Sequence, residues 1–349
     1  MNWFHMRTVP KIPGLFAQNF WNTLLQQVSV TEPAVFHATL TLSSAHKTSQ
    51  AGEDSENSEN SLQRSHDQEK FMLRNYSKAI HHLQPHLATK DLASTRVALI
   101  ACVIFTCLEF LRGNFKTAQI HLKNGLLVLQ ESYGVAYEGV VLLRTAADAT
   151  DQWILETFQR LHVQAELFHR THRHPILILQ PCAPLVPPTS FRTLKEAWTE
   201  LERILYKILA LTGKARYPRS SDSSNPLNPT CYDIPLIPLQ QHIQTSLAHW
   251  LTTYKSSKLH LDPQEPTLFI NAMLMNFHTL ASILSSTALS TELAYDAHTA
   301  RFLTILSNSI HLWKSRPPPK VSINTRLDMS HSTIDFGVDP TVVLYRHKV

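Results

Sequence analysis

The chain has 349 residues, of which 43% are hydrophobic and 17% are charged, with only 8 glycines and 20 prolines. Such a length suits one large domain or two ordinary ones, and the scarcity of glycine argues against a turn-rich β fold. The 32 basic residues outnumber the 27 acidic ones, for a formal net charge of +5, but they are scattered along the chain. A nucleic-acid-binding face needs clustered basic residues, so the composition favours packed helices and gives little support for direct DNA or RNA binding.

Helical periodicity begins near the N-terminus. Apolar residues recur at helical spacing over 15–28, which predicts an amphipathic helix. A second helix is expected to begin near Thr31, a candidate cap, with Pro33 in its first turn. Residues 48–64 are polar, acidic and repetitive, so they can bury little and are predicted to form a disordered insertion. A helix is then expected to resume near Asp67 and to meet Pro85 near its end, running through the apolar residues Phe71, Tyr76, Ala79, Ile80 and Leu83.

Residues 91–131 form the most clearly defined unit. Asp91 or Ser94 can cap a strongly apolar helix that leads to Gly113. Gly113 can adopt the left-handed conformation that ends a helix, and Asn114 can cap the next one. Because the connection is so short, the two helices are predicted to form an antiparallel hairpin.

The remainder of the chain shows the same periodicity, interrupted by proline. Thr150 or Asp151 can cap the first of the later helices. Further helices are predicted over residues 151–170, 190–211, 238–255, 266–287 and 294–315. Proline-rich connections are expected at 175–189 and 213–237, and 317–349 should form an irregular tail. The predicted fold is therefore all-α: one domain over residues 1–316, built as a multi-helix bundle of antiparallel helical hairpins.

No local motif for catalysis or metal binding stands out. The sequence contains no phosphate-binding loop, dinucleotide fingerprint, nucleophile elbow or H-E-x-x-H helix. The cysteines do not have the spacing of zinc ligands, and we interpret them as free thiols: Cys102, Cys107, Cys182 and Cys231. One histidine cluster, His169, His172 and His174, follows a predicted helix, where such side chains are favourable without a metal. His82 and His86 flank Pro85 and are expected to be solvated. We predict no enzymatic activity, no cofactor and no bound metal.

The chain shows no secretory signal and no run of about 18 apolar residues of the kind a membrane span needs. Its longest apolar stretch, 97–107, is expected to be a buried core helix. The expected location is therefore intracellular, without a membrane anchor.

Glu109 is the carboxylate that most needs an explanation, because it lies in a strongly apolar helix one turn before the hairpin connection. A functional carboxylate is conceivable there. An internal pair with Arg112 or His121 that fixes the hairpin is the more common situation. We therefore interpret Glu109 as structural.

Four short segments carry a family resemblance: YSKAI at 76–80, RVAL at 96–99, CLEFLRGN at 107–114 and HLxxG at 121–125. Together they make residues 75–131 similar to the core of the fungal-specific regulatory domain that follows a binuclear zinc cluster in fungal transcription factors. The segments EPAVxHA, from Glu32, and DFGVxP, from Asp335, are also similar to that family. The signature residues within the core are Tyr76, Ala79, Arg96, Cys107, Glu109, Gly113, Asn114, His121 and Gly125.

The resemblance implies an all-α fold and transcriptional regulation in the nucleus. We expect a regulatory or effector domain that acts through protein contacts, with or without a small ligand held between helices. The expected partners are transcriptional co-regulators or a second copy of the chain. The alternative is a helical scaffold that holds partner peptides and is unrelated to transcription; an enzyme with a dispersed site is a third option.

Two departures from the family limit what the resemblance implies. Members usually carry six closely spaced cysteines that bind two zinc ions and place a helix in the DNA major groove. The first cysteine here is Cys102, so neither zinc nor sequence-specific DNA binding is carried over. The sequence stops at Val349, where relatives tend to continue, so we expect a fragment of a longer regulator or a regulator that has lost its DNA-binding half.

Overall fold

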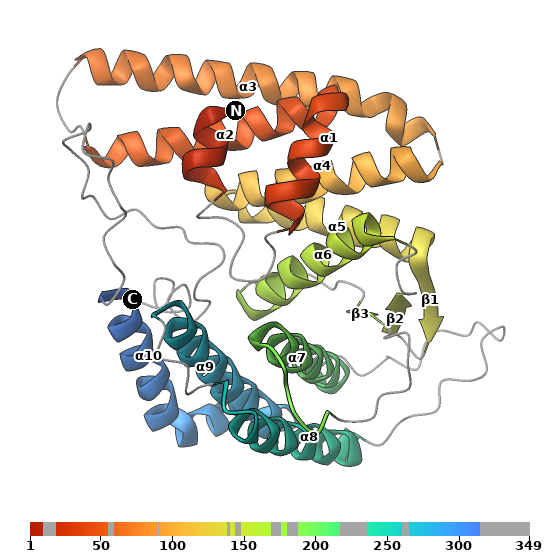
Figure 1. Cartoon of the computed structure of the whole chain (residues 1–349), viewed down its shortest axis with the longest axis vertical. Coiled ribbons are helices and arrows are strands. Elements are labelled where there is room, and N and C mark those ends of the chain that lie inside the picture. Colours follow the sequence, from red (N-terminus) through yellow and green to blue (C-terminus); the bar gives the residue numbers. More distant parts are fainter. Residues whose placement is uncertain are drawn as a thin grey trace. The chain divides into compact units, whose positions relative to one another are not determined.

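The computed structural model describes residues 1–9, 19–54, 59–89, 91–137, 140–143, 148–168, 176–179, 188–216, 236–259 and 265–314. Helices make up most of these residues (Figure 1), which confirms the predicted all-α fold. The chain divides into two compact units, and each is described by itself below. The expectation of one domain over 1–316 stays a prediction.

The first unit contains eight helical elements among its described residues. They are the π-helical turns η1 (Phe4–Thr8) and η2 (Phe20–Leu24) and the helices α1 (Leu25–Thr31), α2 (Pro33–Asp54), α3 (Glu59–Ala88), α4 (Leu92–Leu111), α5 (Phe115–Tyr133) and α6 (Ala149–Phe168). The helix predicted over 15–28 corresponds to η2 and α1, with 10–18 outside the described residues. Thr31 does not cap α2 as predicted. Its hydroxyl donates to the Val28 carbonyl at the end of α1.

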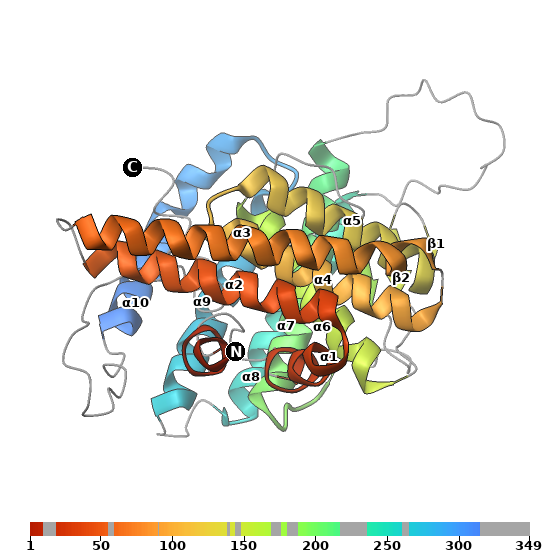
Figure 2. The same ribbon diagram turned by 90° about the horizontal axis from the view of Figure 1, so that it is seen from above.

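Helices α2 and α3 lie side by side along most of their length (Figures 1 and 2). Two hydrogen bonds join them near the predicted insertion, because the Ser44 and Thr48 hydroxyls donate to the carbonyl and side-chain oxygens of Gln68. Helix α2 continues to Asp54 and α3 begins at Glu59, so the helices extend into the segment 48–64 that was predicted as an insertion. Once a helix is anchored by packing, adding residues to it costs little, so polar sequence can extend it. Residues 55–58 lie outside the described residues.

Helix α4 is the core of the first unit and packs against α2, α3, α5 and α6. The Asp91 carboxylate accepts a hydrogen bond from the Ser94 backbone N–H at 2.9 Å, so Asp91 is the cap of the two candidates. By length and composition two helices of the described chain could cross a membrane, Leu92–Leu111 and Thr267–Thr287, but 78% and 61% of their apolar windows are buried within the structure. Such burial is also what a core helix shows, as expected for 97–107.

Three short strands were not predicted: β1 (Gly134–Tyr137), β2 (Val140–Leu143) and β3 (Ile176–Leu179). They form one sheet in the order β1-β2-β3, and β2 pairs in parallel with β3, Val140 opposite Ile176. The sequences VVLL and ILIL are rich in strand-forming aliphatic residues. Four residues are too few to show a periodicity, so the strands were not visible in the sequence.

The second unit holds this sheet and the later helices. These are α7 (Leu194–Arg216), α8 (Leu236–Ser256), α9 (Glu265–Thr287), the 3-10 helix η4 (Glu292–His298) and α10 (Thr299–Lys314). Helix α7 packs against β3, α8 and α9. Trp250 is the centre of the core here: its ring stacks on Tyr254 at 4.9 Å and on His278 at 5.3 Å. Its indole N–H donates to the Ala197 carbonyl at 2.8 Å, so this buried donor is satisfied.

The predicted boundaries of the later helices agree with the structure to within a few residues. The largest differences are at α7, which runs to Arg216 into the expected connection 213–237, and at β3, which lies inside the expected connection 175–189. The rest of those connections, apart from residues 188–189 and 236–237, and the expected tail 317–349 lie outside the described residues.

Candidate functional site

The signature residues of the first unit gather mainly where α3, α4 and α5 meet. The Tyr76 hydroxyl of α3 lies 3.4 Å from Nε2 of His121 on α5. The ring of Phe105 on α4 packs against both side chains: its centroid lies 5.0 Å from that of Tyr76 and 5.5 Å from that of His121. Two residues that are far apart in the sequence therefore meet over one buried aromatic ring.

Burial sets the protonation of this pair. Burial lowers the pKa of His121, and the Glu109 carboxylate opposes that shift. Burial also raises the pKa of Tyr76, with a smaller contribution in the same direction from Glu109. Both shifts favour the neutral side chains near pH 7, and in these forms the pair can share a hydrogen bond.

Glu109 holds the hairpin connection. It is buried, at 3% exposure, and its Oε2 accepts a hydrogen bond from the Asn114 side-chain amide at 2.7 Å. Arg112 Nη1 lies 3.5 Å from Oε1, so Arg112 is the charged partner of the two that were proposed. The Gly113 φ of 75° confirms the predicted left-handed turn. Asn114 does not cap α5 with its side chain as predicted, because that side chain turns back to Glu109.

Arg96 ties α4 to the start of α6. It makes a bidentate pair with Asp151, from Nε at 2.7 Å and from Nη2 at 2.9 Å, and also contacts Asp148. The Tyr133 hydroxyl donates to the same Asp151 carboxylate at 2.9 Å. The predicted cap of α6 was Thr150 or Asp151, but the Asp148 carboxylate accepts the Asp151 N–H and is the cap. This hydrogen bond is the largest cause of the lowered pKa of Asp148.

The remaining signature residues are packing positions. Ala79 of α3 is fully buried. Burial raises the pKa of the Cys107 thiol to about 12, so Cys107 is not a thiolate nucleophile near neutral pH. A Cβ added to Gly125 of α5 would lie 2.3 Å from Cε1 of Phe158 on α6, so the close approach of these helices requires glycine.

Histidines on α2 and α3 form a second polar group that the sequence did not reveal. His86 was predicted to be solvated, but it has two partners. Its Nε2 lies 3.3 Å from the Glu32 carboxylate, and its Nδ1 lies 3.3 Å from the Ser94 hydroxyl. The exposed ring of His82 stacks on His37 with centroids 5.6 Å apart. Among the described residues, no three His, Cys, Asp or Glu side chains converge as metal ligands would. The cluster His169, His172 and His174 lies outside the described residues, and the absence of a metal stays a prediction.

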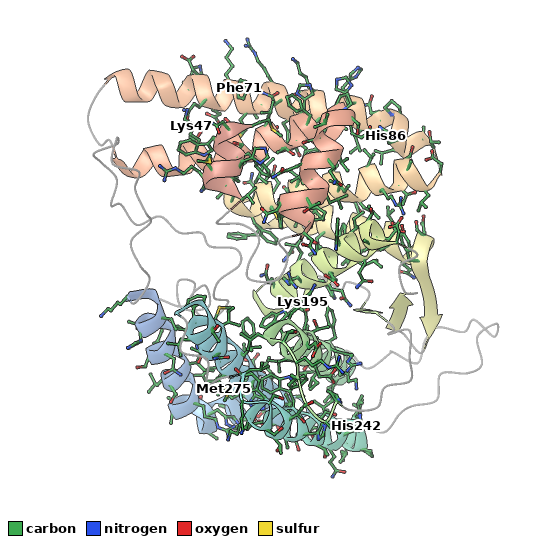
Figure 3. The ribbon with its side chains drawn as sticks, in the orientation of Figure 1. Lys47, Phe71, His86, Lys195, His242 and Met275 are labelled. Atoms are coloured by element: carbon green, nitrogen blue, oxygen red, sulfur yellow. The ribbon has the colours of Figure 1, made fainter. Side chains whose placement is uncertain are left out.

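Helix α3 also presents an exposed apolar stripe, which we call the α3 stripe and define as Leu73, Ile80 and Leu87. These side chains are 45%, 40% and 64% exposed. Nitrogen-tipped side chains also project from the outer side of α3, where Phe71 is labelled (Figure 3). Helix α3 contains all five apolar residues through which it was predicted to run; Tyr76, Ala79 and Leu83 face inward, whereas Phe71 and Ile80 are exposed. The signal that could have revealed the stripe is its seven-residue spacing.

The comparison with known families decides the identity of the domain. A family model for the fungal specific transcription factor domain matches residues 3–287. The chain belongs to this family. No match was found among the curated proteins or the solved structures. The match covers most of the described residues of both units, and no zinc-cluster domain is matched in the chain.

Membership of the fungal specific transcription factor domain family gives the chain a role in transcription regulation, and the family is not an enzymatic one. The signature residues are consistent with that role. Glu109, Arg96 and Gly125 fix the packing of α4 against α5 and α6, while Tyr76 and His121 join α3 to α5. These contacts hold the helices of the first unit together.

Proposed function

We propose that this chain is the regulatory domain of a transcription factor and acts in the nucleus through protein contacts rather than through DNA binding of its own. The observation that carries the proposal is the α3 stripe on a domain of the fungal specific transcription factor family. Solvent-exposed apolar residues that repeat along one helix face are a feature of protein-binding surfaces. The contacts of the signature residues support the fold behind that surface.

The low and scattered positive charge supports the proposal that the chain does not act through DNA binding of its own. The net charge of +5 is small for 349 residues, and basic residues are not concentrated in a stripe along the sequence. Strong DNA binding depends on many phosphate contacts from clustered Lys and Arg. We therefore expect the purified chain to bind DNA only weakly, without sequence preference and with strong sensitivity to salt.

Tethering tests the proposal directly. The full chain is fused to an unrelated DNA-binding domain in yeast, and a reporter gene downstream of the matching operator is measured. We expect reporter output to differ from that of the DNA-binding domain alone, upward or downward. The variant Leu99→Asp is the control: it places a charge at a fully buried position and should unfold the domain, so it shows whether the reporter output requires the folded chain. Reporter output equal to that of the DNA-binding domain alone, or tight sequence-selective binding of the unfused chain in a mobility-shift assay, would contradict the proposal.

A further inference from the structure

We propose that the chain forms a weak homodimer in which the outer face of α5 packs against the same face of a second copy, with the two helices antiparallel. The inference goes beyond the proposed function, because it concerns a different surface and a different partner. It follows from the order of apolar and charged residues along α5, which is complementary to itself when the helix is reversed.

Helix α5 packs on α4 and α6 through one side only. The residues that it buries on that side are Ala118, Gln119, Leu122, Gly125, Leu126 and Leu129. The opposite side carries Ile120 and Leu127, whose side chains are 55% and 40% exposed. These two residues are seven positions apart, which is about two helical turns, so they lie in one row along the helix. A row with this spacing is what one helix presents to another in a two-helix contact.

The charged residues of α5 lie along the same exposed side. They are Lys116, Lys123 and Glu131, all exposed, and the helix contains no other Lys, Arg, Asp or Glu. Lys116 lies about one turn before Ile120, and Glu131 lies about one turn after Leu127. From its first turn to its last, the row therefore carries a cation, two apolar side chains and an anion, with Lys123 on one flank of its centre.

Reversing the helix brings unlike charges together. When two antiparallel copies of α5 meet at the midpoint between residues 123 and 124, position 116 of one copy lies opposite position 131 of the other, and position 120 lies opposite position 127. Two-fold symmetry forms each of these contacts twice. Lys116 then faces the partner's Glu131, and Ile120 faces the partner's Leu127. A parallel pair would instead set Lys116 against Lys116 and Glu131 against Glu131, so the charges select the antiparallel arrangement.

Two features limit the strength of this dimer. The two copies of Lys123 lie on the same flank, close to the two-fold axis, where they repel each other. One helix face of about 22 Å, from residue 116 to residue 131, also buries less than the roughly 1,200 Å² that a stable interface needs. We therefore expect a monomer–dimer equilibrium with a Kd of about 10–100 μM.

Sedimentation of the full chain over a series of concentrations tests the inference. The average mass should rise from the 39.7 kDa of the monomer toward twice that value. Ile120→Glu should weaken the dimer at least about tenfold, because it places a charge against the apolar Leu127 of the partner. Ile80→Glu is the matched control: Ile80 is 40% exposed on α3, and its substitution should leave the dimer unchanged.

Charge exchange separates recognition from a loss of folding. Lys116→Glu alone and Glu131→Lys alone should each weaken self-association at least about tenfold, because each sets like charges against each other twice. An equimolar mixture of the two variants should associate as the unaltered chain does, since both ion pairs are restored between unlike copies. Lys123→Ala should tighten the dimer, because it removes the repulsion beside the two-fold axis.

Four results would overturn the inference. They are a chain that stays monomeric about tenfold above the expected Kd, an effect of Ile80→Glu equal to that of Ile120→Glu, a mixture of the two charge variants that does not associate, and a Lys123→Ala variant that dimerises no more tightly than the unaltered chain. None of them changes the outcome expected for the tethered reporter, so the proposed function is tested separately.

Discussion

Gly125 of α5 faces Phe158 of α6 at so short a range that a single added methyl group would lie 2.3 Å from the phenyl ring. Phe158 is fully buried, so its ring has little room to move. We expect Gly125→Ala to lower the free energy of unfolding by about 1–3 kcal/mol through overpacking, although alanine is the better helix former. Urea unfolding followed by circular dichroism measures the change. Leu127→Ala, at an exposed position of the same helix, should have a much smaller effect.

The Gly125 prediction has an internal check. If the clash with Phe158 is the cause, Phe158→Leu should cost less in the Gly125→Ala background than in the unaltered chain, since the smaller side chain makes room for the methyl group. Additive effects of the two substitutions would show that the loss of stability has another origin.

The pair of Arg96 and Asp151 should contribute more to stability than an exposed pair. Removing one partner of a buried ion pair costs about 3–5 kcal/mol, and we expect Asp151→Asn to fall near the lower end because Arg96 is partly exposed. The matched control is Asp148→Asn, because Asp148 pairs with the same Arg96 but its side chain is 46% exposed, and a loss of about 1 kcal/mol or less is expected. Similar costs for the two variants in thermal or urea unfolding would argue against a structural role for Arg96.

Glu109→Gln tests whether the carboxylate fixes the hairpin turn. The substitution removes the charge that pairs with Arg112 and weakens the hydrogen bond from Asn114, so we expect a loss of about 1–3 kcal/mol. Reporter output of the tethered chain, normalised to the amount of folded protein, should be unchanged. Unaltered stability together with lost regulatory output would instead make Glu109 a functional carboxylate.

Acid should destabilise the chain through two half-buried histidines, His121 and His278. Burial lowers the pKa of His121 and of His278 below the ordinary value of 6.5, so the unfolded chain binds more protons than the folded one below that pH. The free energy of unfolding should therefore fall as the pH drops through about 6.5 toward the folded pKa values. Urea titrations at about pH 8 and about pH 5 measure this, and His121→Gln should reduce the difference. The exposed His66→Gln should leave it unchanged, and an equal effect of the two variants would contradict the role of burial.

The sequence was most informative where local physics decides the structure. The apolar run of α4, the cap at Asp91 and the left-handed Gly113 predicted the α4–α5 hairpin, and each is present. A helix cap was less predictable where another side chain competes for the capping residue. Asn114 turned to Glu109 instead of capping α5, because a buried carboxylate offers a stronger hydrogen bond than a helix end near solvent.

Long-range contacts were not predictable from one sequence. Nothing local connects Arg96 with Asp151 or Tyr76 with His121, since both pairs depend on how helices pack. The four-residue strands were missed because they are too short to show a period. The α3 stripe was missed for a different reason: the apolar residues of this helix do not by themselves show which are buried, and Ile80 points to solvent.

The central claim is that this domain regulates transcription through contacts made by the outer face of α3. The most direct test compares two variants in the tethered reporter assay, each expressed to the same level. Ile80→Glu with Leu87→Glu should bring reporter output to that of the DNA-binding domain alone, while Phe71→Glu should leave it as in the unaltered chain. Equal output from the two variants would contradict the claim.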